Sequence, residues 1–96
     1  MIIGFGNQTT EDVFHGENTK AARRIPAVTW KMAARKLDML NATHELRDLT
    51  VPPGNRLEPL KGDLTGFHSI RINDQFRIVF HWKDGNAHDV RITDYH

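Results

Sequence analysis

The chain has 96 residues, of which 39% are hydrophobic and 26% are charged, and its formal net charge is +1. This length supports one domain, residues 1–96, with a modest core, because folding at this size buries only roughly 60–65% of the extended surface. The composition excludes a wholly disordered chain, and no apolar run reaches the ~20 residues of a membrane span. Because residues 1–6 also lack a basic region followed by an apolar one, we expect a cytoplasmic protein without membrane contact.

The small net charge hides a basic block between residues 20 and 36. Six basic residues and no acid lie in this stretch: Lys20, Arg23, Arg24, Lys31, Arg35 and Lys36. Local positive fields of this kind attract phosphate backbones, whose counterions are released on binding. A solvated helix face is the alternative explanation.

The first elements are short. Met1 to Phe5 is rich in β-branched and aromatic residues and predicts an opening strand. Hydroxyl and acidic residues from Thr9 onward predict a helix of about two turns, which Gly16 ends. Residues 17–24 have no apolar periodicity, so we expect a mobile segment there unless a partner orders it.

A longer helix is predicted from Pro26 to Leu40, because proline suits the first helical position. Its apolar residues form one stripe that can lie on a sheet: Trp30, Ala33, Leu37 and Leu40. A second apolar patch, Val28, Met32 and Met39, points the other way and suggests another packing partner, either the next helix, which is the commoner outcome, or a separate protein such as the antitoxin. A short helix over 44–49, ended by the prolines at 52 and 53, would complete a helical hairpin.

After Gly54 the apolar period changes from 3.6 to 2. Strands are predicted at 56–60, 67–72, 76–83 and 89–93, with tight turns at Asn73-Asp74 and Asp84-Gly85. The fold class is therefore α+β: an N-terminal strand and a helical hairpin packed on one face of a small, mainly antiparallel sheet. The other face of the sheet is expected to be polar and exposed.

The sequence has six histidines and no cysteine. The histidines are His15, His44, His68, His81, His88 and His96, and no two of them have the helical spacing of a metal site. Glycine-rich phosphate loops and nucleophile elbows are also absent from the sequence. We therefore expect no metal and no cofactor.

Cleavage of an RNA phosphodiester needs a base for the 2′-OH, an acid for the leaving oxygen and cations on the phosphate. The strands and the residues after them contain candidates for all three: Glu58, Lys61, Arg71, Arg77, Asp94, Tyr95 and His96. The alternative is that the strand residues are solvated surface groups and that the terminal histidine is mobile.

Three motifs in order carry a resemblance to a known family. They are LEPLKGD at 57–63, FHSIRINDQFRIVF at 67–80 and DYH at 94–96. Together they resemble the killer-protein (HigB) branch of the RelE/ParE toxin superfamily. The first half of the chain agrees in its helical layout and in the opening Met-Ile-Ile.

The resemblance implies a RelE-like microbial RNase fold and the toxin of a type II toxin–antitoxin system. It also implies a ribosome-dependent endonuclease that cleaves A-site mRNA by a metal-free, 2′-OH-driven reaction. The implied partners are a helix-turn-helix, HigA-like antitoxin, the ribosome with its mRNA, and operator DNA only through the antitoxin. Asp94, Tyr95 and His96 match the family's catalytic group, Arg77 its phosphate-stabilising arginine, and Lys61 and Arg71 further phosphate contacts.

Glu58 stands where some members of the family carry a histidine before the proline. A glutamate carboxylate is ionised at neutral pH and is suited to act as a base, whereas His96 can act as either base or acid. Which of the two is the base remains open. The basic block fits this picture, and from its charge we expect it to contact ribosomal RNA.

Two alternatives remain open at the level of sequence. A ParE-like inhibitor that binds DNA gyrase without catalysis would use the same fold, and a protein-binding module would use only its edges and helix faces. The Asp94-Tyr95-His96 group argues against both, because binding alone does not require it. The sequence does not determine codon preference, the antitoxin-binding surface or the oligomeric state.

Overall fold

A four-stranded antiparallel sheet with the order β1-β2-β3-β4 forms the centre of the molecule. The computed structural model describes residues 1–94. The strands are β1 (Glu58–Pro59), β2 (Phe67–Arg71), β3 (Phe76–Lys83) and β4 (Asn86–Asp94). The predicted hairpin between β3 and β4 is confirmed, with Asp84 at φ 54° and Gly85 at φ 76°, the two positive values that a tight hairpin turn requires.

The start of the last strand was predicted three residues too late. β4 begins at Asn86, and its pairing with β3 shifts register between Val79 and His81. Asp89 lies at this bulge with φ 51°. An extra residue breaks the alternation of inward and outward side chains, so the sequence pattern was visible only beyond the bulge.

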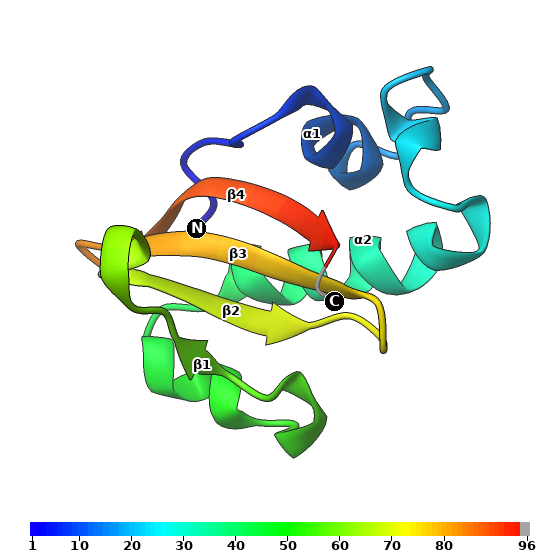
Figure 1. Ribbon diagram of the computed structural model, residues 1–96. Coiled ribbons are helices and arrows are strands. Elements are labelled where there is room, and N and C mark those ends of the chain that lie inside the picture. The colour runs from blue at the N-terminus through cyan, green and yellow to red at the C-terminus, as the bar shows by residue number, and fades with distance from the viewer. Residues whose placement is uncertain (95–96) are drawn as a thin grey trace.

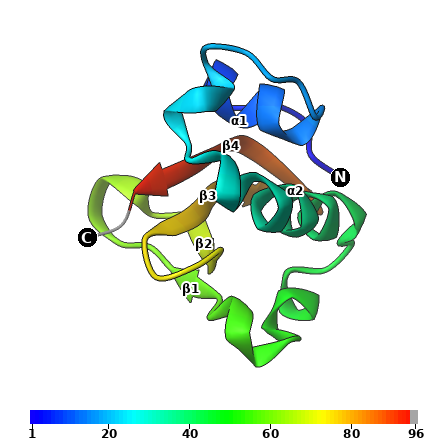
Figure 2. The ribbon, with the colours of Figure 1, turned by 90° about the vertical axis from the view of Figure 1, so that its right-hand side faces the viewer.

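Two α-helices, α1 (Gln8–Phe14) and α2 (Ala27–Ala42), pack on one face of the sheet, as Figures 1 and 2 show. The Asn7 side chain caps α1 by accepting a hydrogen bond from the Thr10 amide at 2.9 Å. The predicted helix is present as α2, which begins at Ala27, one residue later than expected, with Pro26 as its N-cap. In residues 1–94 no helix is long and apolar enough to cross a membrane. The α+β class predicted from the sequence is confirmed.

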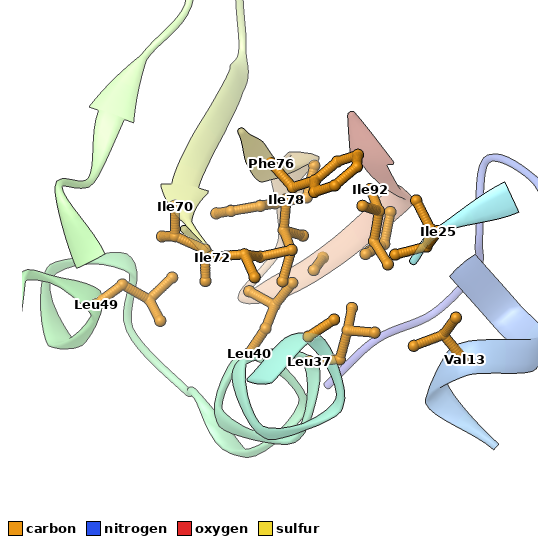
Figure 3. Close-up of a cluster of buried hydrophobic side chains, with 14 of the residues drawn as sticks. Val13, Ile25, Leu37, Leu40, Leu49, Ile70, Ile72, Phe76, Ile78 and Ile92 are labelled. Carbon is orange, nitrogen blue, oxygen red and sulfur yellow. The ribbon is translucent and has the colours of Figure 1, made fainter. Parts of the chain in front are cut away.

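The core lies between the helices and the sheet (Figure 3). The predicted stripe on α2 is confirmed, since Ala33, Leu37 and Leu40 are fully buried and Trp30 packs against them partly buried. The sheet and the other elements contribute the remaining buried apolar residues: Val13, Ala22, Ile25, Leu49, Ile70, Ile72, Phe76, Ile78, Phe80, Ala87, Val90 and Ile92.

The predicted hairpin of α2 with a helix over 44–49 is wrong. Residues Leu46–Thr50 form a short 3₁₀ helix, η2, and Pro53–Asn55 form another, η3. The prolines at 52 and 53 leave too few residues after Ala42 for an α-helix to establish its hydrogen bonds. The helix that packs beside α2 is α1.

The opening strand is present as an irregular extended segment beside β4. Isolated parallel bridges join Ile2 to Ala87 and Phe5 to Val90. The Ile3 amide donates to the Ala87 carbonyl and the Gly6 amide to the Val90 carbonyl, each at 2.8 Å. Residues 1–6 therefore cover the outer edge of β4 without forming a regular strand.

Residues 17–24, predicted to be mobile, are attached to α1. The Thr19 hydroxyl donates to Asp12 Oδ2 at 2.6 Å and accepts from the Ala22 amide at 3.0 Å, where the 3₁₀ helix η1 (Ala22–Arg24) begins. The hydrogen bond from Thr19, and then one from Gln8, lower the pKa of the Asp12 carboxyl. Residues 17–24 are therefore held by side-chain hydrogen bonds and not by a periodic apolar face.

Candidate active site

The face of the sheet away from the helices carries the candidate site. Along β2 and β3 its residues include Ser69, Arg71, Arg77 and Val79, and the register places Arg71 opposite Arg77 and Ser69 opposite Val79. This face was predicted to be exposed, but Ser69 is fully buried, Val79 is buried and Arg77 is only 8% exposed. The segment from Arg56 to Leu64, with β1 and the 3₁₀ helix η4 (Gly62–Leu64), lies over it, so the exposed-face prediction is wrong there.

Within residues 1–94, three acceptors hold the Arg77 side chain in one orientation. Its Nε donates to Ser69 Oγ at 2.8 Å, and its Nη2 donates to the Ser69 carbonyl at 3.3 Å and to the Arg56 carbonyl at 2.6 Å. Arg56 has φ 46°, in the left-handed region that a residue with a Cβ rarely adopts. The guanidinium is thus fixed before any ligand binds, which is what preorganised charge stabilisation requires.

Arg77 opens into a cleft of about 140 Å³, called here the arginine cleft. The cleft is lined by three cations, two carboxylates and one amide: Arg56, Arg71, Arg77, Glu58, Asp74 and Asn73. Arg71 forms an ion pair with Asp74. Glu58 Oε1 lies 4.0 Å from Arg77 Nη2, at the outer limit of an ion pair. A positively charged concave surface of this size suits a phosphate group.

A fourth cation approaches from α2. Lys36 Nζ donates to the side-chain oxygen of Asn55, a buried residue that itself donates to the Leu49 carbonyl at 3.1 Å. Burial lowers the pKa of Lys36, with smaller contributions in the same direction from Arg35 and Arg71. Lys36 therefore lies close enough to Arg71 for the two charges to repel each other. The sequence identified Lys36 only as a member of the basic block, because its contact with Asn55 joins segments that are distant in the chain.

The structure brings some of the predicted site residues together and separates others. Glu58, Arg71 and Arg77 meet in the arginine cleft. Lys61 precedes η4 and is exposed, outside the residues that line the cleft. Tyr95 and His96 lie outside the described residues. Arg56, which the sequence did not single out, lines the cleft because a turn places it there, and no signal in the pattern of strands indicated this.

Asp94 belongs to a different cleft. It lies opposite Phe76 at the end of β4, one residue beyond the Thr93 that faces Arg77. Its Oδ2 accepts a hydrogen bond from Gln75 Nε2 at 3.1 Å, and it lines a cleft of about 370 Å³ with Arg24 of the basic block. The other residues of that cleft are Asn7, Thr9, Ile25, Pro26, Gln75, Phe76 and Ile92.

No histidine of the described region lines the arginine cleft. His68 stacks on Phe80, and burial lowers its pKa against a weaker, opposite effect of a backbone hydrogen bond with Gly66. His81 stacks on Phe67 with ring centres 5.0 Å apart. Among residues 1–94 no group of three or more histidine, aspartate or glutamate side chains is placed to hold a metal ion. The chemistry available in the arginine cleft is that of fixed cations and a carboxylate.

Known structures share this architecture. A YafQ variant from Escherichia coli superposes with a TM-score of 0.63 at 14% sequence identity, covering 98% of this chain and 93% of that one. The YoeB dimer from Staphylococcus aureus gives a TM-score of 0.61 at 25% identity, covering 100% and 97%. The fold is thus that of RelE-like toxins.

Sequence comparison is more specific. Toxin HigB-1 of Vibrio cholerae serotype O1 is 41% identical over 87 residues, 91% of this chain and 90% of the relative. Endoribonuclease HigB of Proteus vulgaris is 32% identical over 75 residues, 72% of this chain and 82% of the relative. The sequence profile described as "RelE-like toxin of type II toxin-antitoxin system HigB" matches residues 5–96. With these matches over nearly its whole length, the chain belongs to the HigB family of RelE-like toxins of type II toxin–antitoxin systems.

Proposed function

We propose that this toxin is a metal-independent endoribonuclease that cleaves mRNA in the ribosomal A site and so inhibits translation. The observation that carries the proposal is the arginine cleft, where a buried and oriented Arg77 lies 4.0 Å from a carboxylate. Membership of the HigB family and the name of the Proteus relative, an endoribonuclease, support the same reaction.

The scissile phosphate occupies the arginine cleft in this mechanism. The guanidinium charge of Arg77 stabilises the charge that develops on the non-bridging oxygens in the transition state. Arg71 and Arg56 add positive charge, and Lys36 raises the local potential behind Arg71. Because Ser69 and the Arg56 carbonyl already hold Arg77, little reorganisation is needed when the phosphate binds.

Two proton transfers complete the reaction. A base takes the proton of the ribose 2′-OH, and the resulting oxygen attacks the adjacent phosphorus and forms a cyclic 2′,3′-phosphate. The bond to the 5′ oxygen breaks, and an acid protonates that oxygen. We assign the base to the carboxylate of Glu58, which lines the cleft. Tyr95 and His96 complete the catalytic group, with His96 as the acid, and Lys61 is a further phosphate contact. Asp94, which lines the neighbouring cleft and accepts from Gln75, joins this group as a positioning residue at the end of β4.

The partner of this toxin is an antitoxin, as membership of a type II toxin–antitoxin family implies. The solved YoeB–YefM complex from Staphylococcus aureus is one toxin–antitoxin assembly on a similar fold, at 19% identity. We infer a helix-turn-helix antitoxin that contacts operator DNA on behalf of the pair, and action in the cytoplasm. Gyrase inhibition is not favoured, because the matching profile and the Vibrio and Proteus relatives carry the name HigB.

Cleavage of mRNA on programmed ribosomes tests the proposal. The Arg77→Gln variant is expected to cleave an A-site codon about 10²- to 10³-fold more slowly, because it loses a preorganised charged donor. Lys83→Gln, at the exposed end of the same strand, should keep the wild-type rate. Intact mRNA with the wild-type protein, or a wild-type rate in Arg77→Gln, would overturn the proposal.

A further inference from the structure

A second depression lies on the same face of the sheet as the arginine cleft. It has a volume of about 250 Å³ and is lined mainly by apolar side chains: Leu60, Leu64, Phe67, Val79, Arg91 and Thr93. We call it the apolar hollow. Leu64 of η4 stands at its rim and is 44% exposed, although a leucine gains free energy by burial. The hollow is somewhat smaller than the ~300–1,000 Å³ of pockets that enclose drug-sized ligands. Its size suits a single flat ring system.

The hollow and the cleft are neighbours along the strands. Val79, in the hollow, follows Arg77 of the cleft by two residues, which corresponds to roughly 6.6 Å along a strand. Thr93 of the hollow is paired directly with Arg77. A ligand that places a phosphate in the cleft can therefore reach the hollow with a group attached to the same sugar.

Two side chains of the hollow are fixed by their neighbours. Phe67 stacks on His81 with ring centres 5.0 Å apart and an interplanar angle of 22°, so its ring is held upright on β2. The guanidinium of Arg91 lies against Gly6, where a Cβ would be only 2.6 Å from Nε. Because glycine has no side chain, the guanidinium of Arg91 can lie against residue 6. Arg91 also forms one wall of the hollow.

We propose that the apolar hollow binds a nucleobase, stacked on Phe67, of a nucleotide next to the phosphate in the arginine cleft. This inference rests on the proposed function and deepens it by assigning a base subsite. The charge around the hollow selects the occupant: the adjacent cleft has three arginines against two carboxylates, and Arg91 adds a cation at the wall. A nucleotide joins negative charge, which the arginines of the cleft attract, to a flat ring that fits an apolar hollow, whereas an apolar peptide side chain offers no charge to the cleft.

Binding of short single-stranded RNA tests the subsite without requiring cleavage. The probes are 2′-O-methyl oligoribonucleotides, which lack the nucleophilic hydroxyl, either intact or with one base removed at each position in turn. Fluorescence anisotropy with the wild-type protein should show one position where loss of the base weakens binding about 5- to 100-fold, the range expected for one stacked base. Phe67→Leu should bind that abasic strand and the intact strand equally, and Phe67→Trp should restore the difference.

A matched control and a separate outcome keep the two proposals apart. Phe14→Leu, a partly buried phenylalanine in α1, should preserve the discrimination of the wild type. Equal affinity of the wild-type protein for intact and abasic strands, or no binding to either, overturns the base subsite, whatever the cleavage assay gives. Loss of antitoxin binding in Phe67→Leu with unchanged RNA binding overturns it too and assigns the hollow to the antitoxin. The proposed function is tested separately, by the cleavage of mRNA on ribosomes with the wild-type protein and with Arg77→Gln.

Discussion

Arg77 owes its orientation to a neighbour in an unfavourable backbone conformation. The Arg56 carbonyl that accepts from Arg77 Nη2 belongs to a residue with φ 46°. A residue with a Cβ in this region costs roughly 1–2 kcal/mol relative to the ordinary helical region. The turn from η3 into β1 keeps Arg56 in this unfavourable conformation. In return, the Arg56 carbonyl points toward Arg77 and holds its guanidinium in place in the cleft.

Substitution of Arg56 separates backbone strain from charge. Arg56→Gly relieves the strain and should leave the free energy of unfolding unchanged or raise it by up to about 1 kcal/mol, whereas Arg56→Ala keeps the strain. Both remove a cation from the cleft and should weaken RNA binding to the same extent. Urea denaturation and anisotropy measure the two effects. Equal stability of the glycine and alanine variants would show that the conformation is not strained.

For single residues, the sequence predicted on which face of the sheet a side chain lies, but not how deeply that side chain is buried. Arg71 and Arg77 were expected on one face because alternation within a strand fixes the side to which each points. Their burial was not expected, because it depends on the chain from Arg56 to Leu64 folding over the sheet. Lys36 was missed for a similar reason, since Asn55 reaches it from another part of the chain.

Among the elements, those with a strong apolar period were predicted and those held by polar side chains were not. The helix predicted over 26–40 is α2 at 27–42, because its stripe of Ala33, Leu37 and Leu40 matches the helical repeat. Residues 17–24 carry no such repeat and are held by hydroxyl and carboxylate groups. A hydrogen bond between Thr19 and Asp12 leaves no periodic trace in the sequence.

Hydrogen exchange measures how far this polar attachment holds residues 17–24. Thr19→Val keeps the volume of the side chain but removes both the donor to Asp12 and the acceptor for the Ala22 amide. Faster amide exchange is expected from residue 17 to residue 24, and unchanged exchange within α2. Thr50→Val, an exposed threonine in η2, is the control. Wild-type protection of residues 17–24 in Thr19→Val would assign their order to apolar packing alone.

For the molecule as a whole, the sequence predicted two layers and the open meander of β2, β3 and β4. It did not predict which helix packs beside α2. The predicted hairpin assumed that consecutive helices are neighbours, but the prolines at 52 and 53 shorten the second one to a 3₁₀ turn, and α1 takes the position beside α2. Which helix packs beside α2 depends on contacts between segments that are distant in the sequence, and a local sequence pattern does not contain this information.

The basic block gives the molecule a second positive region besides the arginine cleft. Lys20, Arg23, Arg24, Lys31 and Arg35 are exposed on η1, α2 and the chain before them, whereas Lys36 is partly buried and donates to Asn55.

Reversing charge in this block tests a contact with ribosomal RNA. Replacing Arg23, Arg24, Lys31 and Arg35 with glutamate should weaken ribosome binding and make it less dependent on salt, because fewer counterions are released. Titrations with ribosomes at several salt concentrations measure both changes. The control is a protein with four glutamate substitutions outside the block, two of them reversals at Arg47 and Lys83 and two at exposed uncharged polar residues. Ribosome affinity unchanged by the first set would exclude this contact.

The edges of the sheet limit how a second chain can attach to the described part of the toxin. The outer edge of β4 is occupied by the backbone of residues 1–6, which pair with Ala87 and Val90. The opposite edge is a strand of two residues, one of them a proline without an N–H to offer. A protein so closed resists growth into an extended intermolecular sheet. We therefore expect a partner to bind the described part of the toxin through helices and side chains. When such a partner dissociates, it does not expose a long unpaired strand edge there.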